Sequence, residues 1–162
     1  MISHGNGHNY TWYDYLGNHF ASHGYIVLTH ENNTVPGIET ASSTTWQHTE
    51  AFLSQLPSIG GGVLVGRVDS SRIVWIGHSR GGEGVVRAYT RVNTGSVTPT
   101  TYSADDIVLL SSIAPNNSLG PTASRPADSN YHLIWGSADG DISGAPNSVG
   151  TWSFAIYERA TG

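Results

Sequence analysis

A serine between two glycines lies where an apolar run gives way to a segment of helical pattern. Apolar residues 73–76 lead into the motif 77–81, Gly-His-Ser-Arg-Gly, which has the spacing Gly-x-Ser-x-Gly. In a strand-to-helix turn of this kind, the strained backbone exposes the serine hydroxyl and leaves no room for side chains at the glycines. The bare pattern is a weak signal, but its place between a strand and a helix is informative. We therefore predict that Ser79 is the nucleophile of an acyl transfer; the alternative is a tight glycine turn with an idle serine.

The elements that would position this serine alternate between apolar runs and helical patterns. Short apolar runs predict buried strands, and apolar residues three and four apart predict helices. The predicted strands are 1–3, 25–29, 73–76, 107–110 and 132–135, and the predicted helices are 10–22, 39–56, 80–92 and 151–160. Strands of continuous apolar character separated by helices favour a parallel sheet with both faces covered. We expect an α/β fold of about five parallel strands in one domain spanning residues 1–162.

Composition excludes several classes of protein. The chain has no cysteine, which rules out disulfides and thiolate metal sites. Its net charge of −5 argues against a nucleic-acid partner, because such a surface needs a basic stripe. No apolar run approaches the roughly 18 residues that a membrane-spanning helix requires. The localisation is left open, and the low charge fraction with many small polar residues is only a weak indication of secretion.

Several segments together resemble the α/β-hydrolases, over nearly the whole chain. Residues 3–7 resemble the His-Gly turn after the third strand of that family, and residues 16–27 its first helix running into the fourth strand. Residues 68–82 are similar to its approach to the nucleophile, and residues 135–139 to the Gly-x-x-Asp turn after its seventh strand. Within the family, the chain is most similar to the dienelactone-hydrolase, platelet-activating-factor acetylhydrolase and cutinase-like polyester-hydrolase branches. The resemblance implies ester hydrolysis by a Ser-His-Asp mechanism without a cofactor.

The tetrahedral intermediate of an acyl transfer carries an oxyanion, which needs two N–H donors about 3 Å away. Arg80, the residue after the serine, supplies one from its backbone at a helix N-terminus. The resemblance implies that the loop after the His-Gly pair supplies the other, from the backbone of Asn6. The alternative for this loop is a flexible turn with no part in catalysis.

The acid of the triad is expected downstream of the serine, because the chain order in this fold is Ser, Asp, His. Asp139 fits by its position after Trp135, and Asp141 is its rival two residues further on. The alternative is a simple turn, since the sequence Asp-Gly-Asp is favourable turn chemistry.

The base is missing from its expected place. In this family it is a histidine after an eighth strand, and no histidine follows Asp139. Residues 151–160 look like the helix before that strand, and the chain begins almost directly in the segment similar to the third strand. We infer a fragment or truncated product that lacks the first two strands and the last strand with the catalytic histidine. His8 and His30 are the two conceivable substitutes, because both are predicted near the carboxyl edge of the sheet.

Two further features bear on the site. His19 and His23 are four residues apart on a predicted helix, as two zinc ligands would be, but no third ligand accompanies them. We therefore predict no metal and no cofactor. Residues 115–117 leave a strand at the same edge of the sheet and are expected to line the acyl or alcohol pocket.

The predicted function is hydrolysis of a small-molecule ester or polyester. Ser79 attacks the carbonyl carbon, Asp139 orients a histidine, and the backbone N–H groups of Asn6 and Arg80 hold the oxyanion. One alternative is a peptidase or amidase with the same turn. Another is a non-catalytic α/β-hydrolase-like piece that associates through exposed sheet edges, which are templates for strand pairing.

Overall fold

A single parallel sheet organises the chain. A computed structural model describes residues 1–32, 35, 37–144, 148 and 150–160. The sheet has five strands, all parallel, in the order β2-β1-β3-β4-β5. The strands are β1 (Ile2–Ser3), β2 (Thr29–His30), β3 (Ile73–His78), β4 (Ile107–Ile113) and β5 (Tyr131–Ile134). The expected α/β fold with about five parallel strands is confirmed.

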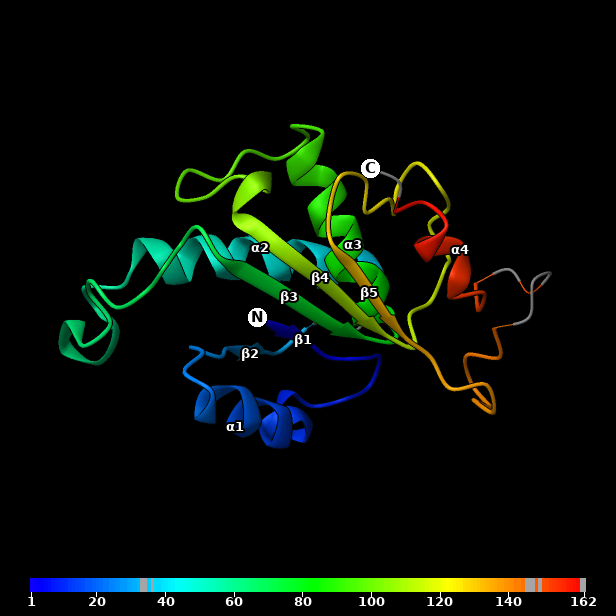
Figure 1. The fold of residues 1–162 in the computed structure, drawn as a ribbon, viewed down its shortest axis with the longest axis horizontal. Coiled ribbons are helices and arrows are strands. Elements are labelled where there is room, and N and C mark those ends of the chain that lie inside the picture. The colour runs from blue at the N-terminus through cyan, green and yellow to red at the C-terminus, as the bar shows by residue number, and fades with distance from the viewer. Residues whose placement is uncertain (33–34, 36, 145–147, 149, 161–162) are drawn as a thin grey trace.

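Helices lie on both sides of this sheet. The α-helices are α1 (Asp14–Ser22), α2 (Ile38–Ser54), α3 (Arg80–Asn93) and α4 (Phe154–Tyr157), and the 3-10 helices are η1 (Tyr10–Tyr13), η2 (Ile59–Gly62) and η3 (Ala104–Asp106). Helix α3 packs on β3 and β4 and is itself covered by α2, while α1 lies on the opposite side of the sheet (Figure 1). Among the described residues, none of the helices is long and apolar enough to cross a membrane.

The packed core lies between the sheet and the α2–α3 layer. Trp75 and Leu110 of the central strands and Val85 of α3 are completely buried there. The indole N–H of Trp75 donates to the Thr49 hydroxyl on α2, 3.1 Å away, so the one polar atom of that ring is satisfied. Packing in this core holds α3 against the sheet. Because α3 begins at the residue after Ser79, the same packing holds the turn that contains Ser79.

The other face of the sheet is less completely covered. An apolar cavity of about 600 Å³ lies there, between α1, the extended chain before β2 and the strands. Leu16 and Phe20 of α1 form one wall, and Ile76 and Leu109 of the central strands line the sheet side. The two faces of the sheet are therefore packed to different degrees.

Most predicted elements differ from the structure by one to three residues at an end, as in β4, which continues to Ile113 beyond the predicted 107–110. Three of the differences show how local contacts set an element's end. The first helix is α-helical only from Asp14, because the Asn9 side chain accepts the Thr11 N–H at 2.9 Å and starts a 3-10 turn. The predicted strand 25–29 forms ladder pairs only at Thr29 and His30, since the register sets Ile2 opposite Thr29. The Leu28 carbonyl still accepts the Ile2 N–H at 2.8 Å, and residues 25–27 lie before the paired stretch.

The third difference is at the C-terminal helix, predicted over 151–160. Its α-helical part is the single turn Phe154–Tyr157. Beyond it, the N–H groups of Arg159 and Ala160 donate to carbonyls only three residues back, which is 3-10 geometry.

The register brings three chain segments to one edge of the sheet. Ser3 of β1 lies opposite Gly77 of β3, and His78 lies opposite Ile113 of β4. Because the strands are parallel, the residues that follow each of them emerge side by side. This is the edge where open α/β sheets bind ligands.

Candidate functional site

Ser79 occupies the sharp turn between β3 and α3. Its backbone has φ 54° and ψ −123°, a left-handed φ that is strained for any residue with a side chain. The Ser79 N–H donates to the Ile113 carbonyl of β4 at 2.9 Å, and the Ser79 carbonyl accepts the Gly82 N–H at 2.9 Å. The strained residue is thus held by both the neighbouring strand and the helix that it begins.

The glycines around Ser79 are required by close backbone approach. A Cβ on Gly77 would overlap the carbonyl of Gly81, and a Cβ on Gly81 would lie 2.5 Å from the Ser3 carbonyl oxygen. No such contact is tolerated, so α3 can sit this close to β1 and β3 only with glycine at both positions. The sequence predicted this requirement from the Gly-x-Ser-x-Gly spacing alone.

The two residues predicted to form the oxyanion hole lie next to each other. Arg80 is the first residue of α3, where backbone N–H groups point out of the helix end. Asn6 lies in the loop after β1, and its side-chain oxygen accepts a hydrogen bond from Arg80 Nη1 at 2.9 Å. A side-chain contact therefore joins the loop after β1 to the start of α3, whose backbones are expected to act together.

The hydroxyl of Ser79 has an asparagine as its partner. Ser79 Oγ donates to Asn116 Oδ1 at 3.3 Å, and the Asn116 N–H donates to the Ser79 carbonyl at 3.4 Å. Residues 115–117 were expected to line a pocket at this edge, and Asn116 does contact the site. The direct bond to the serine hydroxyl was not foreseen, because nothing in the sequence distinguishes Asn116 from Asn117 beside it.

A buried carboxylate anchors the loop that carries Asn116. Glu83 on α3 is fully buried, and it accepts hydrogen bonds from the Ser118 N–H at 2.7 Å, the Leu119 N–H at 2.8 Å and the Ser124 hydroxyl at 3.0 Å. Sequence reasoning missed this residue. The available signal was a lone acid within the run Gly-Gly-Glu-Gly, at helix positions that otherwise lack side chains.

Asp139 lies in a turn that follows β5 at the same edge of the sheet. Its Oδ1 accepts the Asp141 N–H at 2.8 Å and the Ile142 N–H at 2.9 Å, which is the geometry of an Asx turn. Asp141, the rival acid, is exposed. Among the described residues, no histidine lies within hydrogen-bond distance of either carboxylate.

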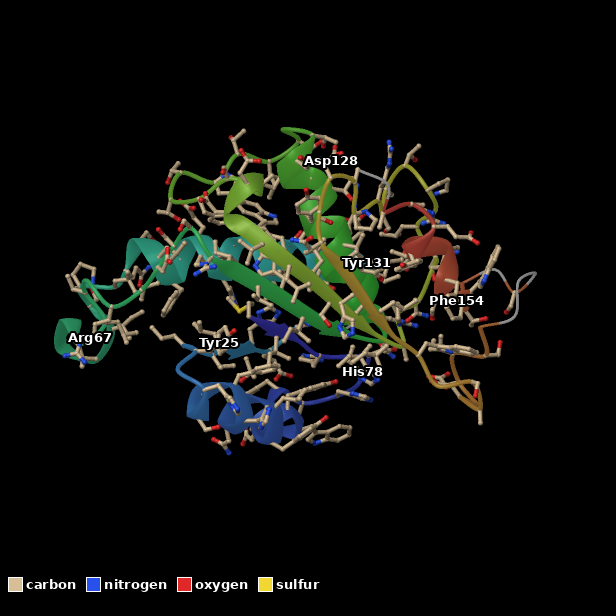
Figure 2. All side chains as sticks on the ribbon, in the orientation of Figure 1. Tyr25, Arg67, His78, Asp128, Tyr131 and Phe154 are labelled. Atoms are coloured by element: carbon tan, nitrogen blue, oxygen red, sulfur yellow. The ribbon has the colours of Figure 1, made fainter. Side chains whose placement is uncertain are left out.

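His8 and His78 stack beside the serine at the carboxyl edge, with ring centroids 5.0 Å apart. Figure 2 shows His78 where the central strands converge. Burial lowers the pKa of both imidazoles, and each feels a second histidine, which lowers the pKa further. The Nδ1 atoms of both rings contact the Tyr13 hydroxyl, at 3.0 Å for His8 and 2.8 Å for His78. His8, one of the two substitutes considered for the base, therefore lies near Ser79 with its Nδ1 bonded to Tyr13, and among the described residues no hydrogen bond joins it to the serine hydroxyl.

His30, the other substitute, lies apart from the serine. It ends β2, which is separated from β3 by β1, and its ring packs against His48 with centroids 5.3 Å apart. Burial, with smaller contributions from His48 and other cationic groups, lowers the pKa of His30 to about 3. His19 and His23 lie side by side on α1, 4.6 Å between centroids. Over the described part of the chain, no three histidine or acidic side chains are gathered as metal ligands would be.

The sheet order, with a strained serine between β3 and α3, is the architecture of an α/β-hydrolase. A family model described as PET hydrolase-like matches residues 2–104. The chain belongs to this PET hydrolase-like family of the α/β-hydrolases, and the resemblance drawn from the sequence is confirmed.

Curated relatives agree with this family. Cutinase 2 of Thermobifida cellulosilytica is 36% identical over 73 residues, which are 45% of this chain and 27% of that protein. Cutinase cut1 of Thermobifida fusca is 36% identical over 73 residues, 45% of this chain and 22% of that protein. The matches thus span about a quarter of the length of these relatives. No solved structure matches the chain significantly.

Proposed function

We propose that the protein is a carboxylic-ester hydrolase in which Ser79 is the nucleophile and forms an acyl-enzyme. The observation that carries this proposal is the strained φ of 54° at Ser79, between a buried strand and a helix N-terminus. Strain of this kind persists only where the surrounding structure enforces it, and it clusters at functional sites. A simple turn with this φ would be easier to form with glycine, so a serine without a role would not explain why a residue with a side chain occupies the position.

The proposed reaction begins with attack of Ser79 Oγ on the ester carbonyl carbon. The carbonyl oxygen becomes an oxyanion, which accepts hydrogen bonds from the backbone N–H groups of Asn6 and Arg80. The contact between Arg80 Nη1 and Asn6 Oδ1 supports a joint role, because it ties the loop that carries Asn6 to the start of α3. Collapse of the intermediate expels the alcohol, and water then hydrolyses the acyl-enzyme.

Proton transfer in this scheme needs a base, for which we propose a histidine oriented by Asp139. The described residues hold no histidine at that position, so the base is an assignment by family and not by geometry. The Asx turn of Asp139 engages Oδ1, and no hydrogen bond from the described residues occupies the second carboxylate oxygen, which could accept such a partner. Asp141 is the alternative acid in the same turn.

For the substrate, we propose esters of small molecules or of polyesters. The relatives are named cutinases and the matching family is named for PET hydrolases, so a carboxylic ester is the linkage common to both. The edge that carries Ser79 is open, since Asn6 and Arg80 are at least partly exposed. No cofactor enters this chemistry.

Turnover of a short-chain nitrophenyl ester tests the proposal. The wild-type protein should release nitrophenol above the buffer rate, and Ser79→Ala should return the rate to that of buffer. The matched control is Ser58→Ala, which removes an exposed hydroxyl in the connection between α2 and β3 and should behave as wild type. Hydrolysis that survives in Ser79→Ala would contradict the proposal.

A non-catalytic role is the second candidate, and one observation favours it. The partner of the Ser79 hydroxyl is the Asn116 side chain, which cannot accept a proton as a catalytic base does. In that case the chain would act by association, through the outer strands β2 and β5. Concentration-dependent sedimentation together with absent ester turnover would support this reading, whereas a monomer with turnover would exclude it.

A further inference from the structure

The Tyr13 hydroxyl contacts three polar groups near Ser79. It accepts the Gly5 N–H at 3.3 Å, and it lies 3.0 Å from His8 Nδ1 and 2.8 Å from His78 Nδ1. Tyr13 is itself buried, with 6% of its surface exposed. These contacts link η1, the loop after β1 and the last residue of β3, which are far apart in the sequence.

The single proton of this hydroxyl determines the tautomers of the two imidazoles. Tyr13 has one proton to donate, and burial raises its pKa, so the hydroxyl keeps that proton. One of His8 and His78 must then accept at Nδ1, and the other must donate from Nδ1 to the phenol oxygen. Because burial lowers the pKa of both rings, both are neutral near pH 7, in opposite tautomers.

Gly5 connects this arrangement to the reaction centre. The position that a Cβ of Gly5 would take lies 3.1 Å from Ser79 Cβ and 3.2 Å from the Nδ1 atoms of both His8 and His78. The backbone at Gly5 is therefore pressed against the nucleophile turn. The next residue is Asn6, so the peptide unit that Tyr13 holds directly precedes the unit that carries the Asn6 N–H.

We propose that Tyr13 is a positioning residue, whose hydroxyl holds the Gly5–Asn6 segment against the Ser79 turn so that the Asn6 N–H reaches the oxyanion. This inference rests on the proposed function for its catalytic consequence. Tyr13 acts through Gly5 and Asn6 and does not touch the substrate. Removal of the hydroxyl leaves the Gly5 N–H and the Nδ1 atoms of His8 and His78 without their common partner. The Gly5–Asn6 segment is then free to move away from the Ser79 turn.

Inactivation kinetics with a fluorophosphonate test the proposal, because phosphonylation of serine also places a negative oxygen in the oxyanion hole. Tyr13→Phe should lower the maximal inactivation rate about tenfold and leave the half-saturating concentration within about twofold. Tyr15→Phe removes a hydroxyl from an exposed tyrosine of α1 and should match wild type. An unchanged maximal rate in folded Tyr13→Phe, or an equal loss in Tyr15→Phe, would overturn the proposal.

A second measurement needs neither a variant nor catalysis. Nitrogen-15 NMR of the wild-type imidazoles should show His8 and His78 in opposite neutral tautomers at pH 7.5. The same tautomer in both rings would contradict the hydrogen-bond arrangement even if the enzyme is active. Opposite tautomers without labelling of Ser79 would instead contradict the proposed function and leave the arrangement at Tyr13 standing.

Discussion

Two parts of the candidate site are built in different ways: the nucleophile side around Ser79 and the acid side around Asp139, each named for its proposed role. Ser79 is strained and is held by β4 and α3, with backbone so close that glycine is required on both sides. Asp139 lies in a largely exposed turn after β5, where, among the described residues, its carboxylate bonds only to the turn that contains it. The nucleophile side is thus preorganised by the sheet and α3. The acid side is held only by its own turn, so in the proposed mechanism its geometry depends on the histidine with which it pairs.

The largest effect is expected from a methyl group added on the nucleophile side. Gly81→Ala places a Cβ against backbone atoms of β1, which cannot move without shifting α3. We expect a loss of at least about 3 kcal/mol in the free energy of unfolding, measured by chemical denaturation. The control is Gly136→Ala beside the acid turn, where nothing lies within 4 Å of the new Cβ. It should change stability by less than about 0.5 kcal/mol, and an equal loss in both variants would remove the contrast.

The next effect concerns the carboxylate beneath the Asn116 loop. Glu83→Gln replaces one acceptor oxygen by an NH₂ group that faces donors already present, so at least one backbone N–H loses its partner. We expect a loss of about 2–3 kcal/mol in the free energy of unfolding. Glu158→Gln, on the exposed end of α4, is the control and should be near neutral. A loss below about 0.5 kcal/mol in Glu83→Gln would show that the loop is held by other contacts.

Acid should destabilise the fold through His30, which is buried at the end of β2 and lies opposite Ser3 of β1. Its pKa is about 3 when folded, against an ordinary value of 6.5. The unfolded chain therefore binds the proton first, and stability present above pH 6.5 is lost as the pH falls toward 3. At pH 5 this amounts to about 2 kcal/mol, measured by denaturation against pH. His30→Gln should flatten the profile relative to the exposed His23→Gln, and an unchanged slope would contradict the assignment.

The smallest effect on stability is expected at the acid itself. Asn at position 139 can still accept the two N–H groups of the turn, so Asp139→Asn should alter the free energy of unfolding by less than about 0.5 kcal/mol. If Asp139 orients the base, the same variant should lower ester turnover by orders of magnitude, because an amide fixes the wrong tautomer of a histidine. A large loss of stability with intact turnover would reverse the proposed division between the two sides.

Much of the fold could be predicted from local patterns in the sequence. The run before Ser79 is apolar over strand length, and the glycines mark the turn, so both β3 and the start of α3 were foreseen. The ends of elements were less predictable because they depend on partners. Residues 25–28 have strand composition, yet the ladder with β1 starts only at Thr29, and Leu28 joins it through its carbonyl alone, which accepts the Ile2 N–H at 2.8 Å.

The contacts that complete the candidate site join residues far apart in the chain. Tyr13 meets His78 across 65 positions, and Ser79 meets Asn116 across 37. Tyr13 belongs to a helical apolar pattern and Asn116 to a predicted loop, so neither residue type indicates a role in the site by itself. Glu83 was missed because a charged side chain on a helix is usually exposed, and this one is buried against loop amides.

The central claim is that Ser79 is an activated nucleophile, and site mapping after fluorophosphonate treatment tests it most directly. The folded protein should carry one phosphonyl adduct, found by peptide mass spectrometry on Ser79 and absent from Ser79→Ala. Protein unfolded before treatment should remain unlabelled, because an unactivated serine hydroxyl is a weak nucleophile. A folded protein with no adduct at Ser79, or with adducts scattered over other serines, would contradict the account.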